Sequence, residues 1–267
     1  MNKIIESYIE KTYGFDVNNA TCEDFLKVTE ILVSDATMDH ENGEWDFSKF
    51  PNLRKIDCSY NPIEKLNISA NTKLEYIRFE GARGNISHKI DFSGNPHLKT
   101  VRSGQDGVKE LDFSSNIELE DLSVFLNSSF RWLNIDNCTN LRRINTQGAN
   151  IPFVDLTHCY KLEKVNVNYW NLYKKRKDEF GPGYPRPFIF VNESFDEEVI
   201  DAEIRQISYY TYYLIRVKKG SIEERFLNKL KSMKDEILAI PENRYGVGVA
   251  IMHYKLLELY KKMKSEQ

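Results

Sequence analysis

The chain of 267 residues is 41% hydrophobic, which is enough to fill the core of one large or two smaller domains and excludes a disordered chain. Its 37 Lys and Arg residues against 40 Asp and Glu residues give a net charge of -3, so a nucleic-acid partner is not expected. No segment approaches the roughly 20 apolar residues of a membrane-spanning helix, and Glu6 lies where a secretory signal would place its apolar run. A cytoplasmic protein without membrane contact is therefore expected, and export without a cleavable signal stays open.

The first 49 residues predict a helical cap. Apolar residues recur at helical spacing in residues 2–13 and 22–33, and Thr21 with Asp24 has the spacing of a capping box. A loop rich in acids follows, from Asp35 to Asp46. Its acids lack the spacing of a calcium-binding loop, so no metal is expected there.

An apolar pattern of the form L-x-x-L-x-L then repeats through residues 53–167, at intervals of 10 to 13 residues. Parallel strands joined by helices need a dozen or more residues between strands, so these strands must follow one another through short turns. The units alternate between two kinds, so one coil holds two strands. The central apolar residues of the units that we call the regular series are Leu66, Ile90, Leu111, Leu133 and Val154. Those of the diverse series are Ile56, Ile77, Val101, Leu122, Ile144 and Val165.

An Asn or Cys follows each regular unit at a fixed distance. Such a side chain can lie inside a tight coil and hydrogen-bond backbone groups that would otherwise be buried without partners. We therefore predict a buried ladder of Asn71, Asn95, Asn116, Cys138 and Cys159. The four cysteines are too few for a disulfide scaffold and lack the close pairs of a zinc site, so reduced thiols are expected.

Over residues 50–170 the pattern L-x-x-L-x-L-x-x-N/C resembles the leucine-rich repeat, in particular the bacterial variety with a period near 21 residues. The resemblance implies an α+β fold: a right-handed, β-rich solenoid of about five coils with helices at its ends. It also implies a rigid surface for a protein partner. The sequence departs from the pattern at an insertion from Gly81 to Asn85 and at residues 168–170, and the diverse series often lacks the Asn.

The outward positions of the two series differ in chemistry. In the regular series they are short and polar, as in Asn67, Asp91 and Asp112, which favours hydrogen bonds between coils. In the diverse series they vary and include Tyr, Phe and Arg, the residues enriched at binding hot spots. Exposed Arg and Tyr also serve merely to keep a sheet soluble, and the sequence leaves open which series is concave. The predicted partner-binding residues are Tyr76, Arg78, Glu80, Arg102, Phe125, Arg142, Arg143, Asn145 and Lys164.

Beyond residue 170 the repeat stops. Prolines and glycines from Gly181 to Pro187 exclude a continuous helix, so residues 171–193 are a predicted linker. Residues 194–267 predict three helices, over the apolar runs Ile200–Val217, Ile222–Ile237 and Val247–Tyr260. Because residues 207–214 are rich in strand-forming tyrosines, a strand there stays an alternative.

No catalytic site is predicted. The five histidines are scattered and expected on the surface, and no zinc-protease, serine-hydrolase or phosphate-loop motif occurs. Some bacterial leucine-rich-repeat proteins carry a cysteine-dependent ubiquitin ligase, but no cysteine follows Cys159 here. We therefore expect a non-enzymatic module that binds a protein, without cofactor or metal. The alternative is an effector with a non-cysteine activity in the C-terminal region, using carboxylates such as Glu193, Asp196, Glu197 and Glu198.

Overall fold

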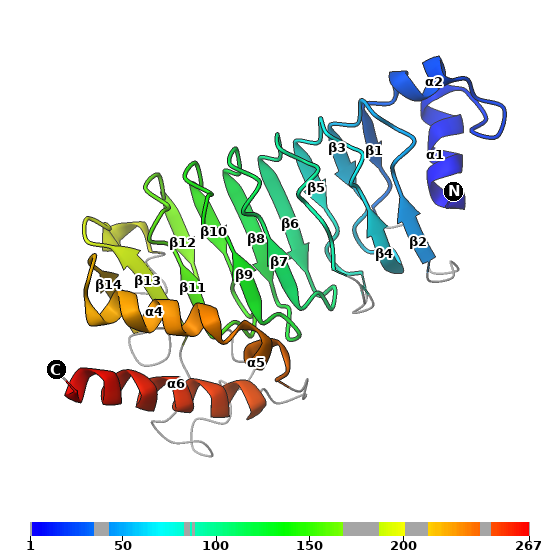
Figure 1. The fold of residues 1–267 in the computed structure, drawn as a ribbon. Helices are drawn as coiled ribbons and strands as arrows, with labels where there is room; N and C mark the ends of the chain where they lie inside the picture. The colour runs from blue at the N-terminus through cyan, green and yellow to red at the C-terminus, as the bar shows by residue number, and fades with distance from the viewer. Residues whose placement is uncertain are drawn as a thin grey trace.

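The computed structural model describes residues 2–34, 43–82, 86, 89–167, 187–200, 213–240 and 247–266. In these residues parallel strands wind into a β-solenoid of about seven turns with helices at both ends, and the two termini lie at opposite ends of it (Figure 1). The resemblance to bacterial leucine-rich repeats is thus confirmed at the level of the fold. The expected five coils are too few, because strands outside residues 50–170 continue the solenoid at both ends.

The N-terminal region is a helical cap that also contains the first coil. Helix α1 covers Lys3–Tyr13 and helix α2 covers Cys22–Lys27, the latter behind the predicted capping box of Thr21 and Asp24. The expected continuation of this helix to residue 33 is wrong, since Glu30–Leu32 form strand β1. The reason is that burial alternates with a period of two residues, as in a strand: Ile31 and Val33 are buried on either side of the exposed Leu32.

The diverse series forms one continuous sheet of seven parallel strands. In order across the sheet these are β1, β3 (Lys55–Asp57), β5 (Tyr76–Arg78), β6 (Thr100–Gly104), β8 (Asp121–Phe125), β10 (Arg143–Asn145) and β12 (Lys164–Asn166). Their central apolar residues pair in register from Ile31 to Val165 and are all buried. At about 4.8 Å per strand, the sheet extends for about 29 Å.

The regular series forms three shorter parallel sheets. They consist of β2 (Gly43–Asp46) with β4 (Ile63–Asn67), β7 (Glu110–Asp112) with β9 (Trp132–Asn134), and β11 (Phe153–Asp155) with β13 (Phe188–Asn192) and β14 (Tyr213–Val217). Between the first two of these sheets, Ile90 is buried at the position equivalent to the centre of a strand, although no strand is assigned there.

The C-terminal region differs from the prediction in its first part. Strand β13 lies within the expected linker, and β14 replaces the end of the first expected helix. A short 3-10 helix, η1, covers Glu197–Val199. The alternative of a strand holds for Tyr213 and Leu214, where aromatic and branched residues pair in parallel with β13; residues 201–212, and 168–186 of the linker, lie outside the described residues.

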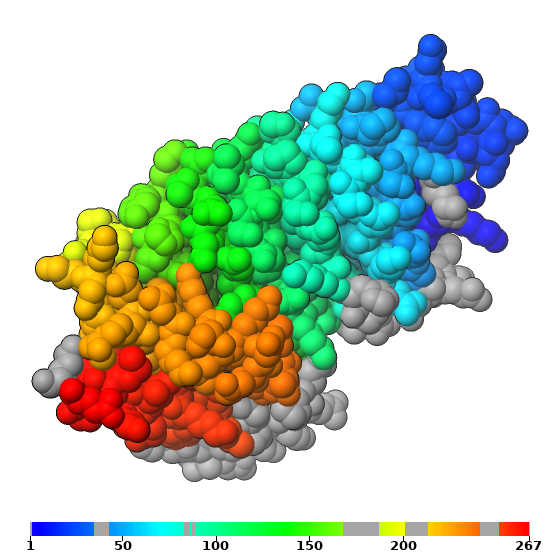
Figure 2. Space-filling view, in the orientation of Figure 1, coloured from blue at the N-terminus to red at the C-terminus, as the bar shows by residue number. Residues whose placement is uncertain are grey.

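The two later expected helices are present. Helix α4 covers Ile222–Ser232, α5 covers Lys234–Leu238 and α6 covers Val247–Ser265. Ser221 caps α4 by accepting a hydrogen bond from the backbone N–H of Glu224 at 3.2 Å. In the space-filling view the coils follow one another in chain order, and these helices lie over part of the last coils (Figure 2).

Buried amides and thiols join successive coils of the regular series. Asn95 donates through Nδ2 to the carbonyl oxygens of Ile68 (3.0 Å) and Asn71 (2.9 Å), and Asn71 and Asn116 make equivalent pairs. Cys138 Sγ lies 3.5 Å from its carbonyl acceptor in the preceding coil, and Cys159 is buried at the next step. Each coil therefore satisfies carbonyl groups of the coil before it.

Candidate interaction surface

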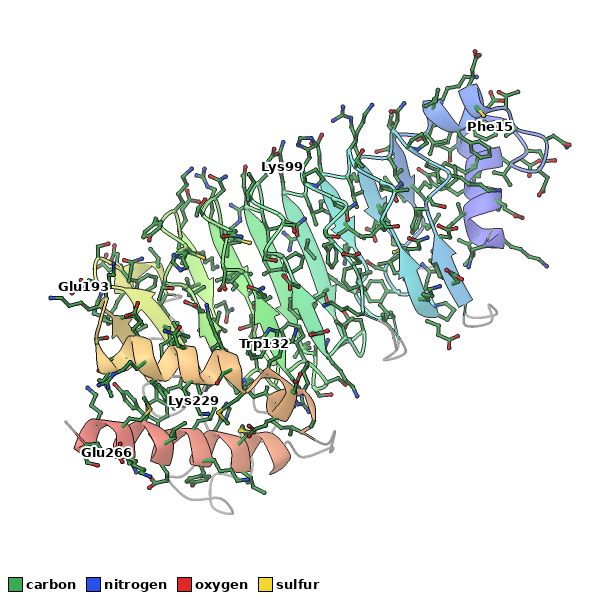
Figure 3. All side chains as sticks on the ribbon, in the orientation of Figure 1. Phe15, Lys99, Trp132, Glu193, Lys229 and Glu266 are labelled. Atoms are coloured by element: carbon green, nitrogen blue, oxygen red, sulfur yellow. The ribbon has the colours of Figure 1, made fainter. Side chains whose placement is uncertain are left out.

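One outward row of the regular series changes character along the solenoid. In the first coils it is charged, at Glu44, Lys65, Lys89 and Glu110, where Lys65 pairs with Glu44 at 2.8 Å. In the last coils the same row is aromatic and buried, at Trp132, Phe153 and Phe188. Figure 3 shows Trp132 on the side of the C-terminal helices, with Lys99 at the opposite edge.

The C-terminal helices pack on this aromatic part of the row. The ring of Phe226 on α4 lies 5.3 Å from that of Phe188 and 5.8 Å from that of Phe190. Lys231 on α4 forms an ion pair of 2.7 Å with the buried Asp155, and Lys234 on α5 one of 2.7 Å with Glu110. Much of the regular face is therefore occupied by the chain itself.

The next row of the regular series serves the turns. Asp112 accepts hydrogen bonds from the backbone N–H of Ser114 (3.0 Å), from its hydroxyl (2.7 Å) and from Asn134 Nδ2 (3.1 Å). Asp91 accepts from the backbone N–H of Ser93, and hydrogen bonds from Ser93 hold the pKa of Asp91 below its usual range. These short side chains stabilise each turn and connect it to its neighbour.

The diverse sheet presents two outward rows of varied side chains. The row before the central apolar residue holds Glu30, Lys55, Tyr76, Thr100, Asp121, Arg143 and Lys164. The row after it holds Leu32, Asp57, Arg78, Arg102, Ser123, Asn145 and Asn166. The structure thus brings six of the nine predicted contact residues, all except Glu80, Phe125 and Arg142, into these two rows.

Asp121 lies between two of the predicted arginines. Its Oδ2 accepts a hydrogen bond from Arg143 Nε at 2.9 Å and from Arg102 Nη2 at 3.3 Å. The carboxylate side chain is 12% exposed, whereas Arg102 is 40% and Arg143 52% exposed. A single carboxylate beneath the surface therefore orients two guanidinium groups that remain accessible.

Arg78 has a different environment. Its Nη2 donates to Glu80 at 2.9 Å, its Nη1 lies 3.5 Å from an oxygen of Asp57, and its guanidinium carbon lies 5.8 Å from the centre of the Tyr60 ring. Glu80, predicted as a contact residue, is buried at 6% exposure, so we correct its role to that of a support for Arg78. Arg78 is thus paired with two carboxylates.

Arg142 lies outside the two rows, just before β10. It pairs with Glu163, and the equivalent positions of other coils pair in the same way, as Arg54 does with Glu75. Along the sheet this edge carries alternating charges, at Arg54, Glu75, Lys99, Glu120, Arg142 and Glu163. Its charges therefore largely compensate one another.

Phe125 lies at the far end of β8, where the diverse strands turn. A Cβ atom at Gly104 would lie 3.0 Å from the Phe125 ring and 2.5 Å from its carbonyl oxygen, so the glycine permits this close packing. The turn itself repeats: the fourth residue after each central apolar residue, from β3 to β10, has a φ between 51° and 73°, at Tyr60, Gly81, Gln105, Leu126 and Gly148.

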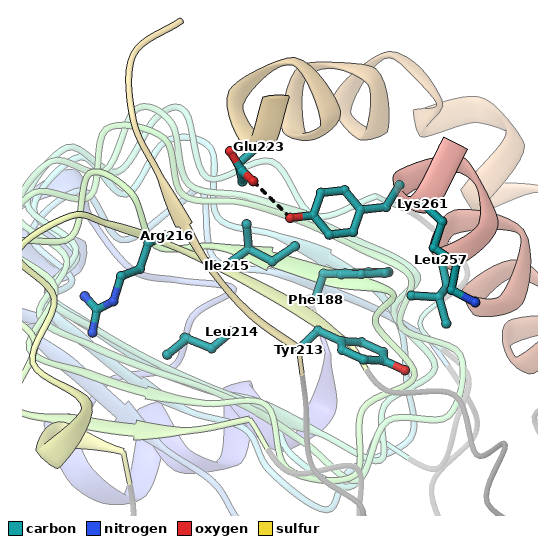
Figure 4. Close-up of a pocket in the computed structure, with 9 residues that line it drawn as sticks. Phe188, Tyr213, Leu214, Ile215, Arg216, Glu223, Leu257 and Lys261 are labelled. Carbon is teal, nitrogen blue, oxygen red and sulfur yellow. Dashed lines mark hydrogen bonds between the residues drawn. The ribbon is translucent and has the colours of Figure 1, made fainter. Parts of the chain in front are cut away.

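A pocket of about 510 Å³ lies beside β14 and α6 (Figure 4). Its lining residues are Phe188, Tyr213, Leu214, Ile215, Arg216, Glu223, Leu257, Tyr260 and Lys261. Burial raises the pKa of Glu223, but the hydrogen bonds it accepts, first from Lys264 and also from Tyr260 (3.1 Å), outweigh this and hold the pKa below its usual range. This carboxylate is therefore ionised and paired, which does not suit a general acid.

The carboxylates of the alternative enzyme hypothesis are exposed, and two of them have structural partners. Glu197 pairs with Arg216 at 2.9 Å, and Asp196 caps η1 by accepting from the backbone N–H of Glu198 at 2.9 Å. They lie on the surface and do not line the pocket. In the part of the C-terminal region that the structure describes, these four carboxylates therefore give no positive support to this alternative.

Three of the four thiols and one imidazole are buried in the described part of the chain. Cys58, Cys138 and Cys159 are buried, and burial raises the pKa of Cys138 to about 12. The expectation of surface histidines is wrong for His253 on α6, which is 3% exposed. Among the described residues no group of three or more His, Cys, Asp or Glu could hold a metal ion, and none of their helices is long and apolar enough to span a membrane.

Two features of the sequence point to residues beyond the predicted contact set. The carboxylates that hold the arginines, Asp57 and Asp121, lie 21 and 22 residues before Arg78 and Arg143, which is one coil. The aromatic row of Trp132, Phe153 and Phe188 occupies equivalent positions of successive regular units and indicates a covered face. Both follow from applying the repeat length to the outward positions.

No family model and no curated protein matches the chain. Among solved structures, it is similar to the functional domain of InlJ from Listeria monocytogenes, described as including a cysteine ladder, with 17% identity over 65% of this chain and a TM-score of 0.29; the chain spans about half (47%) of that protein's length. It is also similar to the internalin InlF from Listeria monocytogenes, with 11% identity over 81% of this chain and 91% of that one, and a TM-score of 0.29. The described strands of this chain themselves form a parallel β-solenoid of the leucine-rich-repeat type.

Proposed function

We propose that this protein is a non-enzymatic interaction module that binds a protein partner through the outward side of the diverse sheet. The observation that carries the proposal is the unequal use of the two faces. The chain covers much of its regular face with its own helices, while arginines of the diverse face stay accessible although they are already oriented by Asp121.

A rigid, oriented surface favours binding because little side-chain freedom is lost on association. Successive coils are joined by the ladder, and Arg102 and Arg143 are held by ion pairs, so backbone and side chains of this face are both fixed. The half-buried Tyr76 lies on the same strand as Arg78, which pairs in register with Arg102, so the same region also holds an aromatic side chain. Tyr and Arg dominate the energetics of known protein interfaces.

Site-specific photo-cross-linking in the source cell tests this proposal. A photoreactive amino acid replaces Tyr76 on the diverse face, Lys65 on the regular face, or Lys261 at the pocket, in three separate full-length variants. We expect one dominant protein adduct from position 76 and none from position 65. Adducts confined to position 65 or 261, or a small-molecule adduct at 261, would contradict the proposal, and the latter would support an enzyme instead.

Variants then test the face directly. With the cross-linked partner purified, the variant Tyr76→Ala/Arg102→Glu should weaken binding by at least 30-fold, since about 2 kcal/mol is typical of one hot-spot residue. The matched control, Lys65→Glu/Lys89→Glu, changes two charges on the regular face and should change binding less than two-fold. Equal losses in both would indicate non-specific electrostatic attraction.

A further inference from the structure

We infer that Arg102 and Arg143 form a receptor for a carboxylate of an acidic segment in the protein partner, an inference that rests on the proposed function. Two guanidinium groups converge on one carboxylate oxygen of Asp121, at 3.3 and 2.9 Å. This cluster therefore has an excess of one positive charge, and each arginine uses only one of its N–H groups for Asp121. The remaining donors of two exposed guanidinium groups can bind a second carboxylate.

The neighbouring arginine on β5, which pairs in register with Arg102, does not have this capacity. Arg78 is paired with both Glu80 and Asp57, so that cluster has an excess of one negative charge. It is also less exposed, at 30% of its side chain. Of the two clusters on this face, only that of Arg102 and Arg143 attracts an anion.

The floor between these arginines is low and polar. Ser123, which pairs in register with Arg102 and Asn145, is a short and buried residue. Asn145 Oδ1 accepts a hydrogen bond from the backbone N–H of Gln147 at 3.0 Å. The side-chain NH2 of Asn145 can therefore donate to a ligand. A carboxylate above Ser123 would thus have the guanidinium of Arg102 on one side and the amide of Asn145 on the other.

The surrounding charges favour a single carboxylate over a long polyanion. The adjoining edge of the sheet alternates in sign, and Glu120 and Glu163 lie beside Arg142 on that edge. A nucleic-acid strand or an anionic membrane would bring phosphates against these acids as well. A peptide that places one Asp or Glu at the cluster avoids this repulsion.

Selection from a random peptide library tests the inference. Twelve-residue peptides displayed on phage are selected on the full-length protein, and the strongest is synthesised with a fluorophore for anisotropy titration. We expect an Asp or Glu at a fixed position. Arg102→Gln/Arg143→Gln should weaken binding at least ten-fold, as should replacement of the peptide's acid by its amide. Lys65→Gln/Lys89→Gln, with the same change of charge on the regular face, should have less than a two-fold effect.

The outcomes separate the two proposals. Peptides that lose affinity with Tyr76→Ala but carry no essential acid would overturn the carboxylate receptor and leave the proposed function standing. Peptides insensitive to every diverse-face variant would contradict both. A selection without acidic peptides overturns the inference. So does tighter binding of a 20-nucleotide RNA or of phosphatidylserine vesicles that depends on Arg102 and Arg143. Circular dichroism of each variant verifies that the fold is retained.

Discussion

The two strands of each coil perform different tasks in this molecule. In the regular series, short polar side chains such as Asp112 stabilise turns, buried amides such as Asn95 join coils, and the late outward row is covered by helices. In the diverse series, the outward side chains pair across strands in clusters whose charge differs from place to place. Uniform outward side chains thus occur in the series that stabilises the coils, and varied outward side chains occur in the series that stays accessible.

The contrast concerns the outside of the coils more than their inside. The diverse series has a partial ladder of its own: Asn61 donates to the carbonyl of Val33 at 2.7 Å, and Asn127 donates to the buried Asp106 at 2.6 Å. Its inward positions therefore also join coils. The two series therefore differ mainly at their outward positions, which is where we place the partner.

The largest expected effect concerns the covered part of the regular face. Phe226→Ala removes a fully buried ring that contacts Phe188 and Phe190, and should destabilise the protein by about 4 kcal/mol, as for other buried aromatic residues. Hydrogen exchange should show loss of protection in α4 and α6 and retained protection in β6 and β8. An equal loss of protection in all strands would mean that the packing of the helices on the regular face also determines the stability of the diverse sheet.

The ladder should have the next largest effect. Asn95→Ala leaves the carbonyls of Ile68 and Asn71 buried without this donor, and should lower the free energy of unfolding by about 3 kcal/mol. The control Asn140→Ala removes two hydrogen bonds near the surface, one to the carbonyl of Ile117 and one from Lys161 Nζ, and should cost about 0.5 kcal/mol. Urea denaturation measures both, and equal costs would show that the buried amide has no special role.

The packing of α6 should depend on pH. Burial lowers the pKa of His253 to about 4, although the backbone of Pro152 and Ile151 acts in the opposite direction. Because the folded pKa is below the unfolded value of about 6.5, protonation favours unfolding, and stability falls as the pH drops from about 6.5 towards 4. Between pH 7.5 and pH 5 this residue should account for a loss of about 2 kcal/mol.

The variant His253→Gln isolates this contribution. The difference between the unfolding free energies at the two pH values should be smaller in this variant than in the unchanged protein by that amount. His158→Gln, at an exposed position, should leave the difference unchanged. The same pH dependence in all three proteins would show that the pKa of His253 is the same in the folded and the unfolded state.

The smallest effect concerns the left-handed turn of the diverse series. Gln105 is exposed and has a φ of 52°, so Gln105→Gly should raise stability by about 1 kcal/mol, while Gln105→Ala should not. Thermal unfolding compares the two. A lower melting temperature for the glycine variant would indicate that the side chain of Gln105 contributes more than its backbone costs.

The sequence predicts the solenoid well because its signal is repeated, so an error at one unit is corrected by the others. It fails at the ends, where one strand stands alone: β1 and β14 lie in segments whose apolar residues also fit a helix, and only pairing with β3 and β13 decides between the two. On the diverse face, the row of Arg102 and Arg143 follows from the repeat. The burial of Glu80 and the second contact of Asp121, with Arg102, depend on side-chain packing and could not be predicted from spacing.

Hydroxyl-radical footprinting of the complex with the cross-linked partner tests most directly whether the two faces have divided roles. Tyr76 and Phe125 report on the diverse face, and the exposed Tyr254 reports on α6. We predict that partner binding slows oxidation of Tyr76 and Phe125 at least five-fold and leaves Tyr254 unchanged. Protection of Tyr254 with unchanged oxidation of Tyr76 and Phe125 would contradict the account.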